Sequence, residues 1–429
     1  MCPTGHVEAC ASTIPFRKGN RQREQIFMTS EFPAETIGRP PPHTLTPHPS
    51  GLVPSWAASC TARTARAGTA PTSYPPGGAS PQPVHRSGLS LSQTDAFVNP
   101  VEARVKDRTP LVLITGATGF VGHQVVHRLR AHPARPRLRL LTHKTSLPTC
   151  CAEAASVVTA SLTDPASLRE VCHGVDTVLH FASALTDDPV TAHAVNTAGT
   201  QALLAEAQRS GVRRFVRLST TAVYGPGPHR GEPGSTDRPP SVTSASRLAG
   251  DTIVLAAGGT ILRPGLVYGV GDVWAVPALA RMISRFPHWI NGGRARLSWI
   301  SVDDLARTAA ALATRTEPLP PSVVLHAAHP DPVTVREVVS TLCRHLGLPL
   351  PRGDVLARDL VTRLGSRADA ALLQRLAQVG EDHWFDCTPL WSLTRLEPGP
   401  GIAEGFAACA PWYREHLDDE MPAPLPSAG

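Results

Sequence analysis

The sequence predicts an α/β fold, in which a doubly wound parallel sheet is followed by a smaller C-terminal α/β region. Two observations support this prediction. A five-residue apolar run, Leu111–Thr115, leads into glycines at 116, 119 and 122 and then into an amphipathic helix pattern. From Pro110 onward, short β-prone runs alternate with helical patterns. Repeated βα units of this length favour a parallel sheet with right-handed crossovers and helices on both faces.

The order of the elements follows from the same periodicity, with proline, glycine and capping residues marking the helix ends. Strands are expected at residues 111–115, 138–142, 156–159, 176–181, 214–219, 260–263 and 323–326. Helices are expected to end at His132-Pro133, to begin at Asp164-Pro165, to run from Ala194 to Arg209, and to begin again at Ser301 and Thr334. Ligands of such a sheet bind at the carboxyl ends of its strands.

Composition divides the chain into three segments. Residues 1–108 are rich in Pro, Ser, Thr, Ala and Arg without periodicity, so we expect a disordered extension there. Three accounts of it remain open: an unstructured tail, a transit-like leader, or an over-long gene model with Met28 as one downstream start. We favour a dispensable extension. Residues 109–270 should form a nucleotide-binding domain, and residues 271–420 should form most of a substrate-binding region.

Charge and cysteine usage exclude several classes of protein. The net charge of +6 is modest for 429 residues, and the arginines are scattered rather than gathered with aromatics on one face, which argues against nucleic-acid binding. Nine cysteines show no Cys-x-x-Cys spacing, so we expect reduced thiols in a cytoplasmic protein and no metal site. No apolar run suits a membrane span or a signal-peptide core, so we expect neither membrane insertion nor secretion.

The glycine turn after the first strand has the chemistry of a phosphate site. Gly116 permits a tight turn, Gly119 has no Cβ to keep a pyrophosphate away, and Gly122 lets the helix press against the strand. The helix N-terminus offers free N–H groups and a partial positive charge to an anion. The sequence therefore predicts dinucleotide binding. The alternative is a glycine-rich βα turn that binds nothing.

A set of motifs in fixed order extends this prediction. The motifs are Gly116-Ala-Thr-Gly-Phe-Val-Gly122, Asp176-Thr-Val-Leu-His-Phe-Ala182, Val195-Asn-Thr-Ala-Gly-Thr200, Leu218-Ser-Thr-Thr-Ala-Val-Tyr-Gly225, Leu262-Arg-Pro-Gly-Leu-Val-Tyr-Gly269, Trp299-Ile-Ser-Val-Asp-Asp-Leu-Ala306 and Trp412-Tyr-Arg-Glu415. Over residues 110 to 416 the chain resembles the extended short-chain dehydrogenase/reductases, the NAD-dependent epimerase/dehydratase family. The resemblance implies a Rossmann-type NAD(P)-binding domain and a small substrate domain.

The same resemblance implies which residues hold the cofactor. They are Gly116, Thr118, Gly119, Phe120, Val121 and Gly122 at the pyrophosphate, Ser161 and Leu162 at the adenine, Phe181, Ala182 and Ser183 at the ribose and nicotinamide, Asn196 and Arg247 beside them, and Pro264 and Gly265 near the nicotinamide. Ser161 departs from the family pattern, which has an acidic residue there. Asn196 has a second interpretation, as a helix residue that bonds only locally.

The end of the second strand bears on the choice of dinucleotide. A carboxylate there would bond the ribose 2′-hydroxyl of NAD, whereas a basic group suits the 2′-phosphate of NADP. The chain has Thr142, His143 and Lys144 and no carboxylate, so NADP is favoured and NAD remains possible. His143 and Lys144 could equally be solvated loop residues.

The catalytic motif of the family is altered. Hydride transfer needs an acid beside the substrate oxygen, and in this family a tyrosine, a lysine four residues later and a Ser or Thr provide it. Here Thr220 fills the Ser/Thr position, but Thr243 stands where the tyrosine is expected and Arg247 where the lysine is expected. A threonine hydroxyl is a far weaker acid than a phenol, and a guanidinium stays protonated.

Three consequences remain open. Another group could protonate the substrate, with Tyr224, Tyr268 and His229 as candidates. We favour structural packing beside a turn for the two tyrosines and a solvated loop position for His229. Water relayed through Thr220 and Thr243 could also protonate the substrate. Alternatively, the chain binds a dinucleotide without turnover.

Outside this motif, Arg263 follows a strand and could pair with a substrate diphosphate or carboxylate, or with Asp303 or Asp304. Trp274, Trp289 and Trp299 are expected in the core or in a cleft wall.

We therefore expect an NAD(P)-dependent oxidoreductase or epimerase acting on a nucleotide sugar or a similar hydroxy or keto substrate. A deoxysugar ketoreductase of a natural-product pathway is the most specific form of this hypothesis. The alternative is a non-catalytic NAD(P)-binding sensor, suggested by the Thr243 and Arg247 pair. The resemblance also implies a homodimer.

Overall fold

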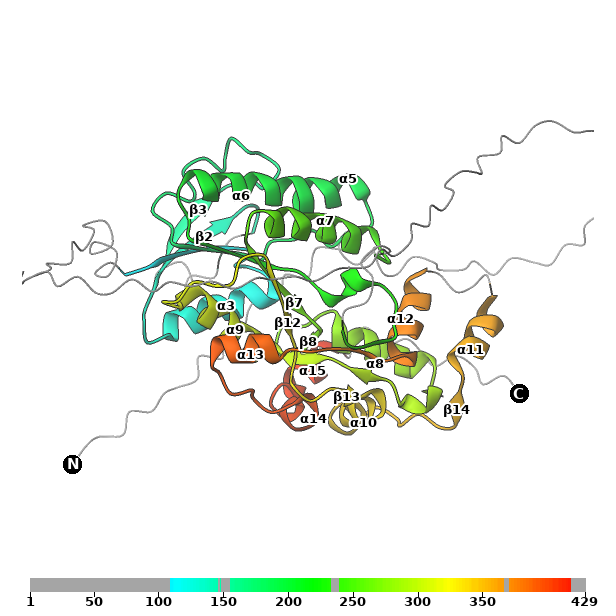
Figure 1. Ribbon diagram of the computed structural model, residues 1–429. Helices are drawn as coiled ribbons and strands as arrows, with labels where there is room; N and C mark the ends of the chain where they lie inside the picture. The colour runs from blue at the N-terminus through cyan, green and yellow to red at the C-terminus, as the bar shows by residue number, and fades with distance from the viewer. Residues whose placement is uncertain (1–108, 146, 148–154, 233–238, 366–369, 418–429) are drawn as a thin grey trace, which may run out of the picture. The chain divides into compact units, whose positions relative to one another are not determined.

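The computed structural model describes residues 109–145, 147, 155–232, 239–365 and 370–417 (Figure 1). The expected extension, residues 1–108, lies outside these ranges. A seven-stranded sheet organises the described chain, and all of its strand pairs are parallel. Its strands, in spatial order, are β12 (Val323–Ala327), β7 (Thr260–Pro264), β5 (Arg214–Leu218), β4 (Thr177–His180), β1 (Leu111–Thr115), β2 (Arg137–Thr142) and β3 (Ser156–Thr159). The predicted parallel sheet and its strands are confirmed.

Helices cover both faces of this sheet (Figure 1). Because side chains alternate along a strand, Val112 and Ile114 of β1 join one core, with helices α3 (Phe120–Ala131) and α9 (Val302–Thr314). Leu111 and Leu113 join the other, with α6 (Gly199–Arg209) and α7 (Val242–Ala256). Every residue of β1 is buried, so the strand that leads into the glycine turn is fixed from both sides.

A second group of elements forms its own core from residues after 264. Its helices are α8 (Ala275–Arg285), α10 (Val335–Leu346), α11 (Ala357–Leu364), α12 (Ala370–Gly380), α14 (Ile402–Gly405) and α15 (Ala410–Leu417). Two strand pairs belong to it, β8 (Leu266–Tyr268) with β11 (Trp299–Ser301) and β9 (Trp289–Ile290) with β14 (Asp354–Val355). A four-stranded sheet has the order β13 (Val333–Thr334), β10 (Arg296–Leu297), β15 (His383–Phe385) and β6 (His229–Gly231), of which β6 comes from earlier in the chain.

The chain passes between the two groups more than once. Strand β12 and helix α9 come after residue 270 but belong to the large sheet, and α13 (Thr388–Thr394) packs on both of them. A boundary at residue 270 therefore does not separate the two cores, because the last strand of the large sheet is supplied by residues 323–327. Within the described ranges, no helix has the length and apolarity needed to span a membrane.

The long helix expected from Ala194 to Arg209 is present but irregular. It begins with α5 (Pro189–Ala192), continues through the π-helical segment η1 (His193–Ala198), and ends as α6. In this segment each backbone hydrogen bond spans five residues instead of four. The carbonyl of Asn196 accepts from two side chains, Thr200 Oγ1 and Arg217 Nη2.

Two expected capping patterns are confirmed, and one expected helix is absent. Ser301 caps α9 by accepting from Asp304 N, and Thr334 and Glu337 form a complete capping box at α10. The helix expected at Asp164-Pro165 is instead a series of turns. Ser167 N donates to Asp164 O and Leu168 N to Pro165 O, so the backbone bonds span three residues rather than four, and the left-handed φ of 64° at Glu170 ends the run.

Candidate active site

The glycine turn has the close approaches that the sequence predicts. Gly116 has a φ of 72°, and a Cβ at this position would lie 2.6 Å from Ala182 N. A Cβ at Gly122 would overlap the carbonyl oxygen of Gly116. Gly119 is different, because a Cβ there would meet only Gly116 O at 3.3 Å. The first and third glycines are thus needed by the fold, whereas the space beside Gly119 is open.

The start of α3 leaves backbone donors without partners inside the helix. Gly119 is the N-cap residue, it has no side-chain cap, and no acidic residue lies in the first turn. The helical ladder begins with His123 N donating to Gly119 O at 2.9 Å, so the N–H groups of Phe120, Val121 and Gly122 precede it. Thr118 is exposed beside them. These donors and the open space at Gly119 fit a pyrophosphate.

The adenine end of the predicted site is less constrained. His143 and Lys144 are exposed after β2, and neither they nor Thr142 is acidic. Ser161 is half-buried, and its hydroxyl pairs with Thr163 Oγ1 at 2.9 Å. Leu162 is buried against the start of α6. Their roles toward a dinucleotide remain predictions.

Asn196 holds the loop that follows β4. Its Oδ1 accepts from Ser183 Oγ at 2.9 Å and from Ala184 N at 2.8 Å, while its Nδ2 donates to Ala184 O and to Ser246 Oγ. The side chain is fully buried in η1. Asn196 therefore connects this loop, η1 and α7, which is more than a local bond along its own helix. Phe181 is buried and Ala182 half-buried at the start of the same loop.

A buried histidine that sequence reasoning missed lies under this loop. His180 Nδ1 pairs with Thr115 Oγ1 at 2.8 Å, and its Nε2 pairs with Thr200 Oγ1 at 3.0 Å. Thr115 Oγ1 also accepts from two backbone N–H groups, so its own proton goes to His180 Nδ1. Burial, with the charges of Arg217 and Arg247, lowers the pKa of His180 to about 3. The ring is neutral and joins β1, β4 and α6.

The two threonines of the altered catalytic motif differ in what their hydroxyls contact. Thr220 caps the short 3-10 helix η2 (Thr221–Tyr224), where its Oγ1 accepts from Ala222 N at 3.2 Å. Its own proton has no acceptor among the described residues. Thr243 Oγ1 donates to Thr186 O at 2.9 Å and accepts from Thr186 N at 3.1 Å. The proton of Thr243 is thus used to hold the loop after β4.

Arg247 lies on α7, one helical turn after Thr243. Its side chain is half-buried, and its Nε is fully covered with no hydrogen-bond partner in the described chain. Burial and the nearby charge of Arg217, opposed by Asp251, lower the pKa of Arg247 to about 10. The guanidinium remains protonated at neutral pH, so it brings a positive charge and an unused donor to the site.

A buried ionic network fixes α7 on the sheet. Asp251 on α7 is fully buried, and it accepts from Arg217 Nη1 of β5, from Arg263 of β7 at 2.8 and 3.0 Å, and from Ser219 Oγ at 2.7 Å. Arg217 also donates to the backbone carbonyls of Arg247 and Asn196. The predicted salt bridge of Arg263 to Asp303 or Asp304 is wrong, because its partner is Asp251 on α7.

The candidates for a replacement acid lie elsewhere in the fold. Tyr224 Oη pairs with His326 Nε2 of the edge strand β12 at 2.7 Å, and burial, opposed by Arg263, raises the pKa of Tyr224. His229 is buried, because β6 pairs with β15, and its ring stacks near His383 and Phe385. The interpretation of His229 as a solvated loop residue was therefore wrong.

Tyr268 and the tryptophans also have defined environments. Tyr268 is buried against Trp299 and Phe406, and its burial raises its pKa. Trp299 is buried as expected, but Trp274 is 43% exposed, so it is not a core residue. Near the same strand ends, Pro264 is buried and Gly265 N donates to Ala327 O at 3.1 Å. A side chain at Gly265 would overlap Ser298, so this position needs glycine.

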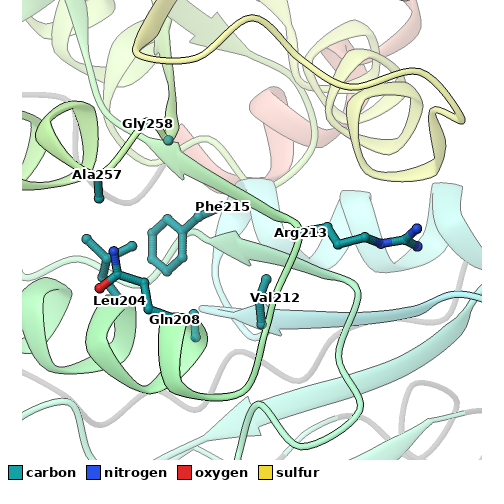
Figure 2. A pocket seen from close by; sticks show the side chains of 9 residues that line it. Leu204, Gln208, Val212, Arg213, Phe215, Ala257 and Gly258 are labelled. Atoms are coloured by element: carbon teal, nitrogen blue, oxygen red, sulfur yellow. The ribbon is translucent and has the colours of Figure 1, made fainter. Parts of the chain in front are cut away.

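Two other features of the described chain leave the location of the site unchanged. Among the residues that the structure describes, no group of three or more His, Cys, Asp or Glu side chains could hold a metal ion. Figure 2 shows a hollow at the amino ends of the strands, where β5 begins and α7 ends. Its lining residues are Leu204, Ala207, Gln208, Val212, Arg213, Phe215, Ala257, Gly258 and Gly259. It lies away from the carboxyl ends of the strands and does not belong to the predicted site.

Comparisons with known proteins agree with this architecture. Residues 112–325 match the model of the NAD dependent epimerase/dehydratase family. The chain is 29% identical to a ceramide reductase of Caulobacter vibrioides, over 72% of this chain and 96% of the relative, and 30% identical to a 3-diazoavenalumate denitrifying reductase of a Streptomyces species, over 61% and 93%. It also resembles the fold of dTDP-glucose 4,6-dehydratase from Streptomyces venezuelae, a double mutant solved with NAD bound, with a TM-score of 0.55, 23% identity and coverage of 71% and 97%.

Proposed function

Because this chain belongs to the NAD-dependent epimerase/dehydratase family, we propose that it is an NAD(P)-dependent oxidoreductase acting on a ketone or secondary alcohol. The observation that carries the proposal is the alignment of three features at one edge of the sheet. They are the open glycine turn before α3, the loop after β4 that Asn196 holds, and Thr220 at the end of β5. In a doubly wound fold this edge binds the ligand.

A dinucleotide fits the residues present. The N–H groups at the start of α3 would hold its pyrophosphate, and His143 or Lys144 would contact a ribose 2′-phosphate, so we propose NADP, with NAD as the alternative. The guanidinium of Arg247, which is half-buried on α7, would hold the nicotinamide ribose. Phe181, Ala182, Ser183, Pro264 and Gly265 would line the nicotinamide side.

The chemistry follows from the two groups whose hydrogen-bonding capacity is unused. When bound, a nicotinamide dinucleotide would supply or accept the hydride. Thr220 would donate a hydrogen bond from its hydroxyl to the substrate oxygen, and Arg247 would stabilise the negative charge that develops there. Neither group is a ready source of a proton at neutral pH, so water would deliver the final proton to the alkoxide. Thr243 would position the loop after β4 and would not act as the acid.

Simple oxidation or reduction suits this site better than elimination of water. Elimination needs a base for the carbon acid and an acid for the leaving hydroxyl. The residues after Thr220 are Thr221 and Ala222, which are not acidic, and Asp251 is fully engaged with two arginines and Ser219. We therefore favour ketone reduction, or the reverse oxidation, over dehydration.

The test is oxidation of NADPH and NADH by the purified full chain with a panel of ketones, including keto-sugar nucleotides. We expect turnover with at least one ketone, and we expect Thr220→Ala to lose turnover while it retains dinucleotide binding. Arg247→Ala should lose turnover and also weaken dinucleotide binding. Absence of NADPH and NADH binding by calorimetry would contradict the proposal.

A second candidate function is dinucleotide binding without turnover, as in a sensor. The observation in its favour is that Thr243, at the position of the family's catalytic tyrosine, uses its proton on a backbone carbonyl. Tight NADPH binding with no turnover across the whole panel would support this alternative.

A further inference from the structure

In residues 270–274 of the loop between β8 and α8, large apolar side chains are exposed and the charged side chain is buried. Val270, Val273 and Trp274 are 43%, 44% and 43% exposed, respectively. The one charged residue of the loop, Asp272, is 1% exposed. Exposure of several large apolar side chains in a short segment is unfavourable in water, and such a surface usually serves binding.

The buried aspartate holds this loop in a fixed conformation. Its carboxylate accepts from Trp274 N, Ala275 N and Val276 N at 2.7 to 2.9 Å, which caps the start of α8, and from Tyr413 Oη at 2.8 Å. Tyr413 Oη in turn accepts from Gly269 N. Both ends of the loop are therefore tied to the C-terminal core. The apolar side chains are held outward by this arrangement and are not exposed by fraying.

The loop lies against the predicted cofactor site. A Cβ at Gly271 would be 3.1 Å from Cδ2 of Phe120, the first residue of α3. The open space at Gly119 is one residue from this contact. Leu185, 44% exposed, lies in the loop after β4 that Asn196 and Thr243 hold at the same edge of the sheet. Apolar side chains thus lie beside the glycine turn and in the loop after β4, the two segments that border the predicted site.

The charges of the same region do not suit a diphosphate. Proteins bind phosphate groups with backbone N–H groups or with arginine and lysine, and residues 270–274 contain neither cation. The N–H groups of Trp274 and Ala275 already donate to Asp272, and Arg263 is buried and bound to Asp251. This loop therefore offers a diphosphate no cationic side chain.

We propose that residues 270–274 form an apolar wall of the substrate site, and that the substrate is a ketone or secondary alcohol borne on an alkyl chain or an apolar ring system rather than on a sugar nucleotide. This inference rests on the proposed oxidoreductase function, and it assigns that function a substrate class.

The test uses the full chain, NADPH and a series of 3-oxoalkanoate esters of increasing chain length, beside a keto-sugar nucleotide. Each buried methylene should raise kcat/KM about fourfold until the wall is covered. Val273→Asp should flatten this dependence through KM. Val157→Asp is the matched control, because Val157 is also 44% exposed but lies on β3. Val273→Ala, which adds no charge, should reduce the slope if the aspartate variant does not fold.

Binding separates a failure of this inference from a failure of the proposed function. If no ester is reduced, calorimetric affinity for the esters in the presence of NADPH should still rise with chain length and fall in Val273→Asp. That result would support the apolar wall while contradicting the oxidoreductase. Affinity or turnover that is independent of chain length, or preferred turnover of the keto-sugar nucleotide, would overturn the inference and leave the proposed function intact.

Discussion

At the scale of single residues, Thr220 and Thr243 make a matched pair, because both are half-buried threonines in the altered catalytic motif. Only Thr220 has an unused hydroxyl proton. Thr220→Val should lower kcat by about 100-fold, the cost of one donor to a developing oxyanion, with little change in unfolding temperature. Thr243→Val should mainly lower stability and raise the KM for the dinucleotide, because it frees Thr186. Steady-state kinetics and thermal unfolding of both variants test this assignment. An equal loss of kcat in the two variants would contradict it.

The carboxylate of Asp251 gives a second prediction at this scale. Asp251→Asn leaves the buried guanidinium groups of Arg217 and Arg263 without a counter-charge, so it should cost about 3–5 kcal/mol in free energy of unfolding. Arg230→Ala removes an ion pair with Asp382 in which Arg230 is largely exposed, and it should cost less than about 1 kcal/mol. Urea unfolding measures both. Similar losses in the two variants would show that the buried network is not what fixes α7.

Residues were predictable where their environment is local in sequence. The glycine roles follow from a turn of seven residues, and Asn196 was identified by its place in a motif. The partner of Arg263 was not predictable, since Asp251 reaches it only after α7 folds back over β5 and β7. His229 was misjudged for a related reason: the strand that buries it, β15, is more than 150 positions away in the sequence.

At the scale of elements, the junction of β1 and α3 distinguishes a glycine needed for folding from one needed for binding. Gly122→Ala should prevent normal folding, because its Cβ would overlap the Gly116 carbonyl oxygen. Gly119→Ala should fold, since its Cβ meets only one atom at 3.3 Å, but it should weaken NADPH binding by at least about tenfold by filling the space for the pyrophosphate. Circular dichroism and calorimetry test the two variants. Unchanged affinity in Gly119→Ala would place the dinucleotide elsewhere.

Helix starts were predicted well at Thr334 and poorly at Asp164. Thr334 and Glu337 form their capping box as expected. Asp164-Pro165 has an equally good start signal, and Asp164 Oδ1 does accept from Ala166 N. The backbone bonds that follow join each residue to the third residue before it, as in Leu168 N to Pro165 O and Arg169 N to Ala166 O, so tight turns form in place of an α-helix. Local start signals say little about whether the next turn will propagate.

At the scale of the whole molecule, a buried and a half-buried histidine make the stability depend on pH. Burial lowers the pKa of His180 to about 3 and that of His383 to about 4, below the value near 6.5 of an unfolded chain. As pH falls below about 6.5, the unfolded state binds protons that the folded state cannot, so stability present at neutral pH is lost toward pH 4. At about pH 5 each histidine should cost on the order of 2 kcal/mol.

Urea unfolding at about pH 7.5 and pH 5 measures this loss. His383→Phe should remove roughly half of it, whereas His173→Asn, at a side chain that is 82% exposed, should leave it unchanged. Equal pH dependence in all three proteins would show that these rings do not govern acid stability.

The parallel character of the large sheet followed from the alternation of strands and helices. Its strand order did not, because the chain crosses from β3 at one edge of the sheet back to β4 beside β1. The return of the chain through α9 and β12 could not be anticipated either. That return depends on the apolar face of α9 meeting α3, a contact between segments far apart in sequence. The C-terminal core likewise combines short strands whose pairing has no periodic signal.

The π-helical segment η1 has a geometric consequence for the two faces of its helix. An α-helix advances about 100° per residue, so the one extra residue shifts the angular phase of everything before Asn196 relative to everything after it. Both flanking helices, α5 before the segment and α6 after it, pack on α7. Deletion of one residue from the segment would rotate α5 by about 100° relative to α6, so the two helices could not both keep the faces that now contact α7.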